Sequence, residues 1–236
     1  MSQLFDCSID AELLAGMRAA RRAIAQGELV VVPTDTVYGV AADAFSPAAV
    51  ARLLEAKGRT RTSPPPVLIG SMSALDALAE SVPDAVRALG AKFWPGGLTI
   101  IVDAQPSLAW DLGDTRGTVA VRIPNHPLVL ELLAETGPLA VSSANLTGQA
   151  PGATAAQTKD QLGGRVSVYL EAGTVGGVAS TIVDATALTR GTGGVRIVRS
   201  GKVTTAALRK ILGDVLEVPP APVKKTAPVK KPSGGS

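Results

Sequence analysis

Short apolar runs that alternate with helical patterns constrain the fold of this chain more than any other feature. Apolar residues recur at helical spacing from Asp10 to Gln26 and stop at Gly27, and the β-branched run Leu29 to Val32 then predicts a buried strand. Ser46 and Pro47 open another helix, as expected of an N-cap that is followed by proline. Such alternation indicates an α/β fold, because helices must cover the faces of the sheet.

The same two patterns continue along the chain and predict a mixed sheet. Further strands are expected at 67–69, 98–102, 118–123, 139–141, 166–170, 181–183 and 196–198. Further helices are expected at 73–80, 83–93, 127–135, 154–162 and 204–212. Several late strands have no helix between them, and short connections join antiparallel strands. We therefore predict an α/β domain whose sheet is mixed rather than purely parallel.

The first predicted strand ends in an unusual polar cluster. After Pro33 stops the strand, two hydroxyls, a carboxylate and a phenol follow before a glycine: Thr34, Thr36, Asp35 and Tyr38. Open α/β folds bind ligands at the carboxyl edge of their strands, so this cluster is a candidate ligand site. For the segment taken alone, an ordinary polar turn is an equally good interpretation.

A basic loop follows the second helix. It contains Lys57, Gly58 and Arg59, with Arg61 close behind, and it precedes the stiff segment Pro64 to Pro66. Cations on such a loop suit the clamping of a phosphate or a carboxylate. The alternative is that the helix dipole attracts Lys and Arg to its C-terminal end, and the local sequence slightly favours this alternative.

Polar side chains also mark the ends of three later strands. Ser143 and Asn145 follow the strand at 139–141, where a capped turn is the alternative interpretation. Arg122 lies near the end of its strand and suits an anionic ligand group, although a surface charge is the default expectation. Ser180 begins a strand just after two glycines, where the backbone permits close approach.

The distribution of charge argues against general nucleic-acid binding by the folded part. Residues from Pro219 onward hold four lysines and no acid, which leaves 19 basic against 20 acidic residues in the remainder. We predict a folded domain over residues 1–215 and a disordered Pro- and Lys-rich tail over residues 216–236. A solubilising tail is the favoured interpretation, and an electrostatic arm for RNA is the alternative.

Several other classes of protein are not expected. No apolar run reaches the roughly 18 residues of a membrane span, and the N-terminus does not resemble an export signal. The single cysteine, Cys7, fits a reducing cytosol, so we expect a cytoplasmic protein. The single histidine, His126, is interpreted as structural, and neither a P-loop nor a strand-linked GxGxxG motif is present.

Five motifs together resemble the YrdC family, over approximately residues 12–212. They are PTDTVYG at 33–39, the Lys57 and Arg59 pair, RIPNHP at 122–127, SSANLTG at 142–148 and STIVD at 180–184. The resemblance implies a twisted open α/β sheet with flanking helices and a large, positively lined concave cleft. It implies a single-domain threonylcarbamoyl-AMP synthase, which makes threonylcarbamoyl-AMP and pyrophosphate from L-threonine, bicarbonate or CO₂, and ATP. A separate tRNA threonylcarbamoyl transferase complex would use the product to modify tRNA.

The resemblance also implies roles for individual residues. Those at the ATP phosphates and reaction centre are Lys57, Arg59, Ser143 and Asn145. Further nucleotide-binding residues are Ser63, Thr118 and Arg199. Threonine would be held by Thr36, Arg122 and Ser180, with Thr34 and Tyr38 shaping the same pocket. Asp35 is expected to hold the turn rather than act as a base, and Mg²⁺ would be carried by the triphosphate with few protein ligands.

The sequence departs from the family pattern in the basic loop. Thr60 stands where family members usually have proline, and Pro65 and Pro66 replace apolar residues. These changes keep open the alternative of a family member that binds nucleotide but has lost synthase activity. Another alternative is a non-catalytic module that binds double-stranded RNA or tRNA, because the family's concave cleft is basic. The scarcity of aromatic residues, which serve as stacking platforms for RNA bases, argues against that alternative.

Overall fold

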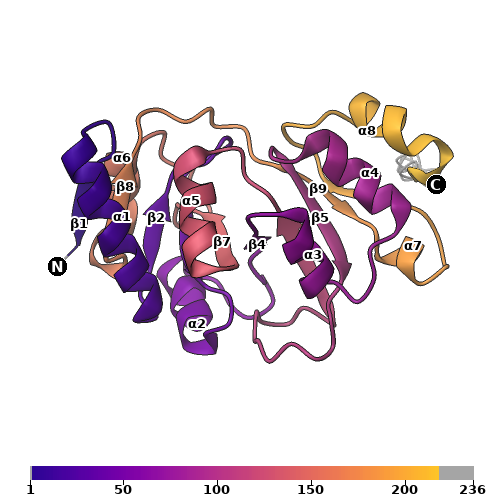
Figure 1. The fold of residues 1–236 in the computed structure, drawn as a ribbon, viewed down its shortest axis with the longest axis horizontal. Helices are drawn as coiled ribbons and strands as arrows, with labels where there is room; N and C mark the ends of the chain where they lie inside the picture. Colours follow the sequence, from indigo (N-terminus) through magenta and orange to yellow (C-terminus); the bar gives the residue numbers. More distant parts are fainter. Residues whose placement is uncertain (1, 218–236) are drawn as a thin grey trace, which may run out of the picture.

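A ten-stranded sheet forms the centre of the computed structural model, which describes residues 2–217 (Figure 1). The strands lie in the order β1-β8-β2-β3-β7-β4-β6-β5-β9-β10. Their bounds are β1 (Gln3–Asp6), β2 (Val30–Val32), β3 (Gly39–Asp43), β4 (Val67–Leu68), β5 (Leu98–Asp103), β6 (Thr118–Arg122), β7 (Leu139–Ser143), β8 (Val168–Glu171), β9 (Thr181–Asp184) and β10 (Arg196–Arg199). The sheet contains both parallel pairs, such as β1 with β8, and antiparallel pairs, such as β3 with β7, which confirms the predicted mixed sheet.

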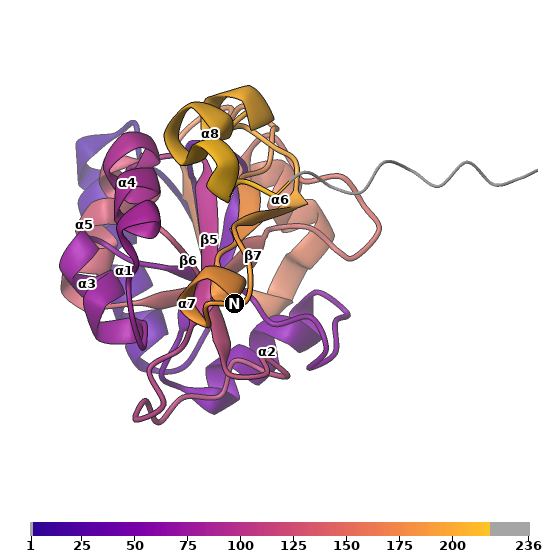
Figure 2. The same cartoon turned by 90° about the vertical axis from the view of Figure 1, so that its right-hand side faces the viewer.

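Helices pack on the sheet from more than one side. Their bounds are α1 (Asp10–Ala25), α2 (Pro47–Ala56), α3 (Met72–Leu78), α4 (Asp84–Phe93), α5 (Pro127–Thr136), α6 (Ala155–Leu162), α7 (Thr186–Thr189) and α8 (Thr205–Leu212). In Figure 2, α1, α3, α4 and α5 lie on one side of the strands, and α2 and α6 lie on the other. No helix within residues 2–217 is both long and apolar enough to cross a membrane.

Strand β2 shows why its sequence is apolar throughout. Val30 and Val32 pack in a core cluster with residues of α1 and α5, whereas Val31 packs in a different cluster with residues of α2 and α6. A strand that is covered on both faces needs apolar side chains at every position, unlike a strand with one face in water.

Strands β5, β6 and β9 are covered by helices on one face only. In β5, Ile100 and Val102 join the core cluster that contains residues of α4 and α8. The alternate residues Thr99 and Ile101 line a cavity of about 450 Å³ on the opposite face. Because strand side chains alternate between faces, a closed core and an open cavity share the same strand. The cavity corresponds to the concave cleft that the family resemblance implies.

Three elements were not predicted from the sequence: β1, β3 and α7. Strand β3 begins at a glycine and contains two alanines, residues with low strand propensity. It forms because it is paired on both sides, with β2 and with β7. The polar cluster after β2 therefore lies in the connection between two antiparallel strands.

The end of the folded domain lies beyond the predicted boundary at residue 215. Leu216 is only 2% exposed and pairs with Val195, and the Glu217 amide donates to the carbonyl of Val195 at 2.9 Å. Residues 218–236, most of the predicted tail, lie outside the described part of the chain.

Candidate active site

The cavity over β5 and β6 brings together eight of the twelve predicted site residues. These are Thr34, Thr36, Arg59, Thr118, Arg122, Ser143, Ser180 and Arg199. They come from the β2–β3 connection, the loop after α2, and the strands β6, β7 and β10, together with the residue just before β9. Segments that lie far apart in the sequence therefore meet on the walls of one cavity.

Three guanidinium groups converge on the cavity and give it a positive lining. Arg59, Arg122 and Arg199 are among its lining residues, and none of the residues that line it is an aspartate or glutamate. Burial lowers the pKa of Arg199, and the positive charges of Arg122 and Arg59 lower it further. Cations that disfavour one another in this way favour an anionic ligand between them.

Hydroxyl groups hold two of these guanidinium groups in place. Arg59 donates through Nη1 to Ser142 Oγ at 3.0 Å. Arg199 donates through Nη2 to Ser180 Oγ at 2.9 Å and also to the Ser180 carbonyl at 2.8 Å. The cavity therefore offers oriented cations and hydroxyls, the donors that suit phosphate and carboxylate oxygens.

Arg122 is 6% exposed and bonded on three sides. Its Nε donates to the Gly96 carbonyl at 2.9 Å, Nη1 donates to Thr36 Oγ1 at 2.9 Å, and Nη2 pairs with Asp35 Oδ1 at 2.5 Å. Burial alone would raise the pKa of Asp35, but Arg122, the Asn125 amide and Lys202 together lower it below its ordinary value. Asp35 is not among the cavity-lining residues and is held as an ion-pair partner behind Arg122.

Thr34 and Thr36 line the cavity with different bonding. The Thr34 hydroxyl accepts from the amides of Thr36 and Val37 at 3.1 and 3.2 Å and donates to the Val37 carbonyl at 2.6 Å. These bonds use its hydrogen-bonding capacity within the turn. Thr36 Oγ1 accepts from Arg122 Nη1 and lies 3.0 Å from Thr34 Oγ1, so the two hydroxyls and Arg122 form one bonded group at the cavity wall.

Lys57 and Asn145 lie behind the cavity wall rather than on it. Lys57 is fully buried, and its ammonium donates to the carbonyls of Ser143 and Asn145. Burial, and then the charge of Arg59, lower the pKa of Lys57 to about 8. Asn145 donates through Nδ2 to the carbonyls of Leu146 and Gln149, while its buried Oδ1 has no partner within the described structure. Both side chains thus organise the turn that presents Ser143.

Ser63 and Tyr38 are also absent from the cavity lining. The hydroxyl of Tyr38 lies 2.8 Å from Glu171 Oε1 and accepts from the Ala172 amide at 3.0 Å. Its ring is fully buried in the core under α2 and α6. Tyr38 therefore packs beneath the site and does not form a wall of the cavity.

The structure adds Thr99, which sequence reasoning missed, and shows that Arg61 lies outside the cavity lining. Thr99 is buried and lines the cavity, with its Oγ1 2.9 Å from Ser180 Oγ. The sequence did contain a signal, because Thr99 is the one polar residue in the otherwise apolar strand predicted at 98–102. Arg61 instead forms a bidentate pair with Asp111, at 2.8 Å for both bonds, so it does not serve as a third clamp residue.

The donor groups of the site do not form a metal centre. Within residues 2–217, no group of three or more His, Cys, Asp or Glu side chains is arranged to hold a metal ion. The cavity lining supplies hydroxyls and guanidinium groups, and guanidinium groups cannot ligate a cation.

Comparisons with known proteins agree on the family. The sequence model of the Sua5/YciO/YrdC family, described as "Telomere recombination", matches residues 22–201. A Mycobacterium tuberculosis protein with the provisional name threonylcarbamoyl-AMP synthase is 49% identical over 214 residues, 90% of this chain and 96% of the relative. The threonylcarbamoyl-AMP synthase of Pyrococcus abyssi is 32% identical over 220 residues, 92% of this chain and 63% of the relative.

Solved structures show the same relationship. The crystal structure of P. abyssi Sua5 complexed with L-threonine matches with a TM-score of 0.80 and 30% identity, over 92% of this chain and 62% of that one. E. coli YciO has a TM-score of 0.76 at 22% identity, over 88% of this chain and 100% of that one, and supports the fold alone. On the family model, the relatives and the fold together, this chain belongs to the Sua5/YciO/YrdC family.

Proposed function

We propose that this chain is an L-threonylcarbamoyladenylate synthase, which forms threonylcarbamoyl-AMP and pyrophosphate from L-threonine, bicarbonate or CO₂, and ATP. The observation that carries the proposal is the convergence of Arg59, Arg122 and Arg199 on one cavity whose lining contains no carboxylate. The substrates bring a triphosphate and an amino-acid carboxylate, and such a cavity suits both. The names of the relatives from M. tuberculosis and P. abyssi support the same activity.

The chemistry needs positioned charges rather than a protein nucleophile. The amine of threonine forms a C–N bond with CO₂ and loses a proton, which gives a carbamate. A carbamate oxygen then forms a bond with the α-phosphorus of ATP, and the bond from this phosphorus to pyrophosphate breaks. Cations and hydroxyls that are fixed around the triphosphate stabilise the charge that develops on the leaving group. The cavity lining supplies these groups and contains neither histidine nor cysteine.

The contacts of each residue support a division of the cavity into two ends. Thr36 and Arg122 form one bonded unit, and we assign the carboxylate and amine of threonine to that end. Thr118, on β6, lines the part of the cavity that we assign to the nucleotide. Arg59 and Ser143 would then lie beside the phosphates, with Lys57 holding the turn behind them.

We infer that ATP enters as its Mg²⁺ complex and that Mg²⁺ is part of the substrate rather than a resident cofactor. This assignment is supported by the absence of carboxylates among the residues that line the described cavity. Phosphate oxygens and water are ligands that Mg²⁺ accepts readily.

We also propose how the product is used. Threonylcarbamoyl-AMP is a mixed anhydride, a reactive species that suits immediate transfer to a nucleophile. We assign its consumption to a tRNA threonylcarbamoyl transferase complex, in the cytoplasm, where tRNA is modified. We include a direct contact with tRNA in this proposal, because the positive cavity lining suits the phosphates of RNA.

A pyrophosphate-release assay with ATP, bicarbonate and each amino acid in turn tests the function. We expect turnover that depends on L-threonine and on bicarbonate. Arg59→Ala should lower this turnover by about 10²-fold or more, because it removes a cation from the phosphates. Arg209→Ala, on the exposed side of α8, is the matched control and should have no effect. Binding of double-stranded RNA without any turnover would instead identify a non-catalytic module.

A further inference from the structure

An ion pair between Asp35 and Lys202 lies behind Arg122, outside the cavity lining. Asp35 Oδ1 accepts from Arg122 Nη2 at 2.5 Å and from the Asn125 amide at 2.9 Å. Lys202 Nζ donates to Asp35 Oδ2 at 3.2 Å and to the Asp35 carbonyl at 2.5 Å. The Asp35 side chain is 8% exposed, so its two oxygens are held by protein donors rather than by water.

The position of Lys202 is fixed by the backbone around it. It lies in the short connection between β10 and α8, and its amide donates to the Ala179 carbonyl at 3.0 Å. The aliphatic part of its side chain lies over Gly97, where an added Cβ atom would come within 2.8 Å of Lys202 Cβ. Gly201 permits the same close approach, since a Cβ there would lie 2.3 Å from the Ala179 carbonyl oxygen. The backbone of this segment therefore places the Lys202 ammonium group next to Asp35.

The ion pair controls how Arg122 can use its hydrogen-bond donors. A guanidinium group has five N–H donors, and Arg122 spends three of them on Gly96, Thr36 and Asp35. A carboxylate that is free to rotate prefers to pair with a guanidinium group through both oxygens. Lys202 donates to the second oxygen of Asp35, so Asp35 accepts only one hydrogen bond from Arg122.

We propose that Lys202 is a positioning residue for the amino-acid substrate. By holding Asp35 Oδ2, its ammonium group prevents a bidentate pair between Asp35 and Arg122, and two N–H groups of Arg122 remain for the carboxylate of L-threonine. This inference rests on the proposed function and adds to it a residue, Lys202, that none of the sequence motifs contains.

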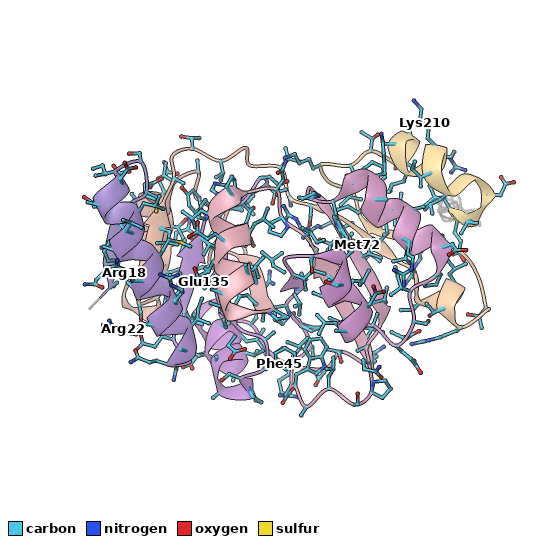
Figure 3. The ribbon with its side chains drawn as sticks, viewed as in Figure 1. Arg18, Arg22, Phe45, Met72, Glu135 and Lys210 are labelled. Carbon is cyan, nitrogen blue, oxygen red and sulfur yellow. The ribbon has the colours of Figure 1, made fainter. Side chains whose placement is uncertain are left out.

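Lys202→Met tests the proposal, because it keeps the aliphatic stem over Gly97 and removes only the ammonium. The KM for L-threonine should rise about tenfold, the typical effect of losing one hydrogen bond to a charged group. The value of kcat at saturating threonine and the KM for ATP should stay within about twofold of wild type, and calorimetry should show the same loss of threonine affinity. Lys202→Arg should recover part of the loss. Lys210→Met, a lysine that projects from α8 into solvent (Figure 3), is the matched control.

The outcomes separate this proposal from the proposed function. Wild-type turnover that depends on threonine, together with an unchanged KM for threonine in Lys202→Met, would overturn the positioning role alone. An equal rise in the KM values for threonine and ATP would also overturn it, because a merely structural brace would act on both substrates. Wild-type protein that releases no pyrophosphate with any amino acid would overturn the proposed function, and the positioning role with it.

Discussion

Lys57 is the predicted site residue whose surroundings differ most from the expectation. The family resemblance placed its ammonium at the ATP phosphates, whereas the structure bonds it to the carbonyls of Ser143 and Asn145. Sequence gives the residue type and its place at the end of a helix. It does not reveal that the end of α2 lies against the end of β7. This contact directs the Lys57 side chain to the carbonyls behind the cavity wall. By contrast, Arg59 lies two residues later and does line the cavity.

The burial of Lys57 has a measurable consequence for stability as pH changes. Folding lowers its pKa from an ordinary 10.5 to about 8. Between these two values the unfolded chain holds a proton that the folded chain has released, so stability rises with pH in this window. Lys57→Met removes this titration. The difference in the free energy of unfolding, wild type minus variant, should therefore increase by up to about 1.4 kcal/mol per pH unit.

Urea unfolding at several pH values across this window makes the comparison. Below the folded pKa both states carry the proton, and the difference should become independent of pH. The constant difference there measures the loss of a donor to two buried carbonyls against the relief of a buried charge. Lys210→Met should give a flat difference throughout. A flat difference for Lys57→Met as well would mean that the buried ammonium keeps its ordinary pKa.

Among the elements, strands β2 and β3 show what local sequence could and could not predict. Strand β2 is a run of three valines and was identified at once. Strand β3, with two alanines, depends on its pairing with β2 and β7, and this pairing is not visible in local sequence. The predicted cap of α2 was correct, because Ser46 accepts from the Ala49 amide at 3.3 Å. The elements that sequence missed are those that tertiary contacts create.

Two loops that border the end of the cavity that we assign to the nucleotide are joined directly. The loop after α2 supplies Pro64 to Pro66, and the β5–β6 loop supplies Leu112. Arg61 pairs with Asp111 through its side chain, and its carbonyl accepts from the Asp114 amide at 2.8 Å. The ion pair is exposed and adds little stability by itself. The close approach of the two backbones is therefore the feature to test.

Gly113 makes that approach possible. Its φ is +100°, and a Cβ atom there would lie 2.6 Å from the Arg61 carbonyl oxygen. Gly117, in the same loop, has a φ of +77° with nothing within 4 Å of a Cβ. Both changes to alanine introduce backbone strain of about 1–2 kcal/mol. Gly113→Ala should cost at least about 1 kcal/mol more by urea unfolding, because it also pushes the loops apart. It should also raise the KM for ATP; equal effects for the two variants would contradict this role.

At the scale of the whole molecule, helices cover both faces of one part of the sheet and only one face of another part. Strands β2, β3 and β8 have helices on both faces, whereas the face of β5 and β6 that carries Thr99 and Arg122 opens into the cavity. The family resemblance implied this cleft, but composition and charge did not. The part of the chain before the lysine-rich end is nearly neutral, so the positive character of the site comes from where three arginines are placed.

The extent of the folded domain gives the last prediction. A chain that ends after Glu217 should match the full chain in thermal stability and in pyrophosphate release, because it keeps the pairing of Leu216 with Val195. A chain that ends after Val215 should lose about 2 kcal/mol or more, because it lacks a leucine that is 2% exposed and packs in the main core. Thermal unfolding and turnover of both shortened chains make the comparison. If the chain that ends at 217 loses turnover, residues 218–236 contribute to function, and a merely solubilising tail is the wrong hypothesis.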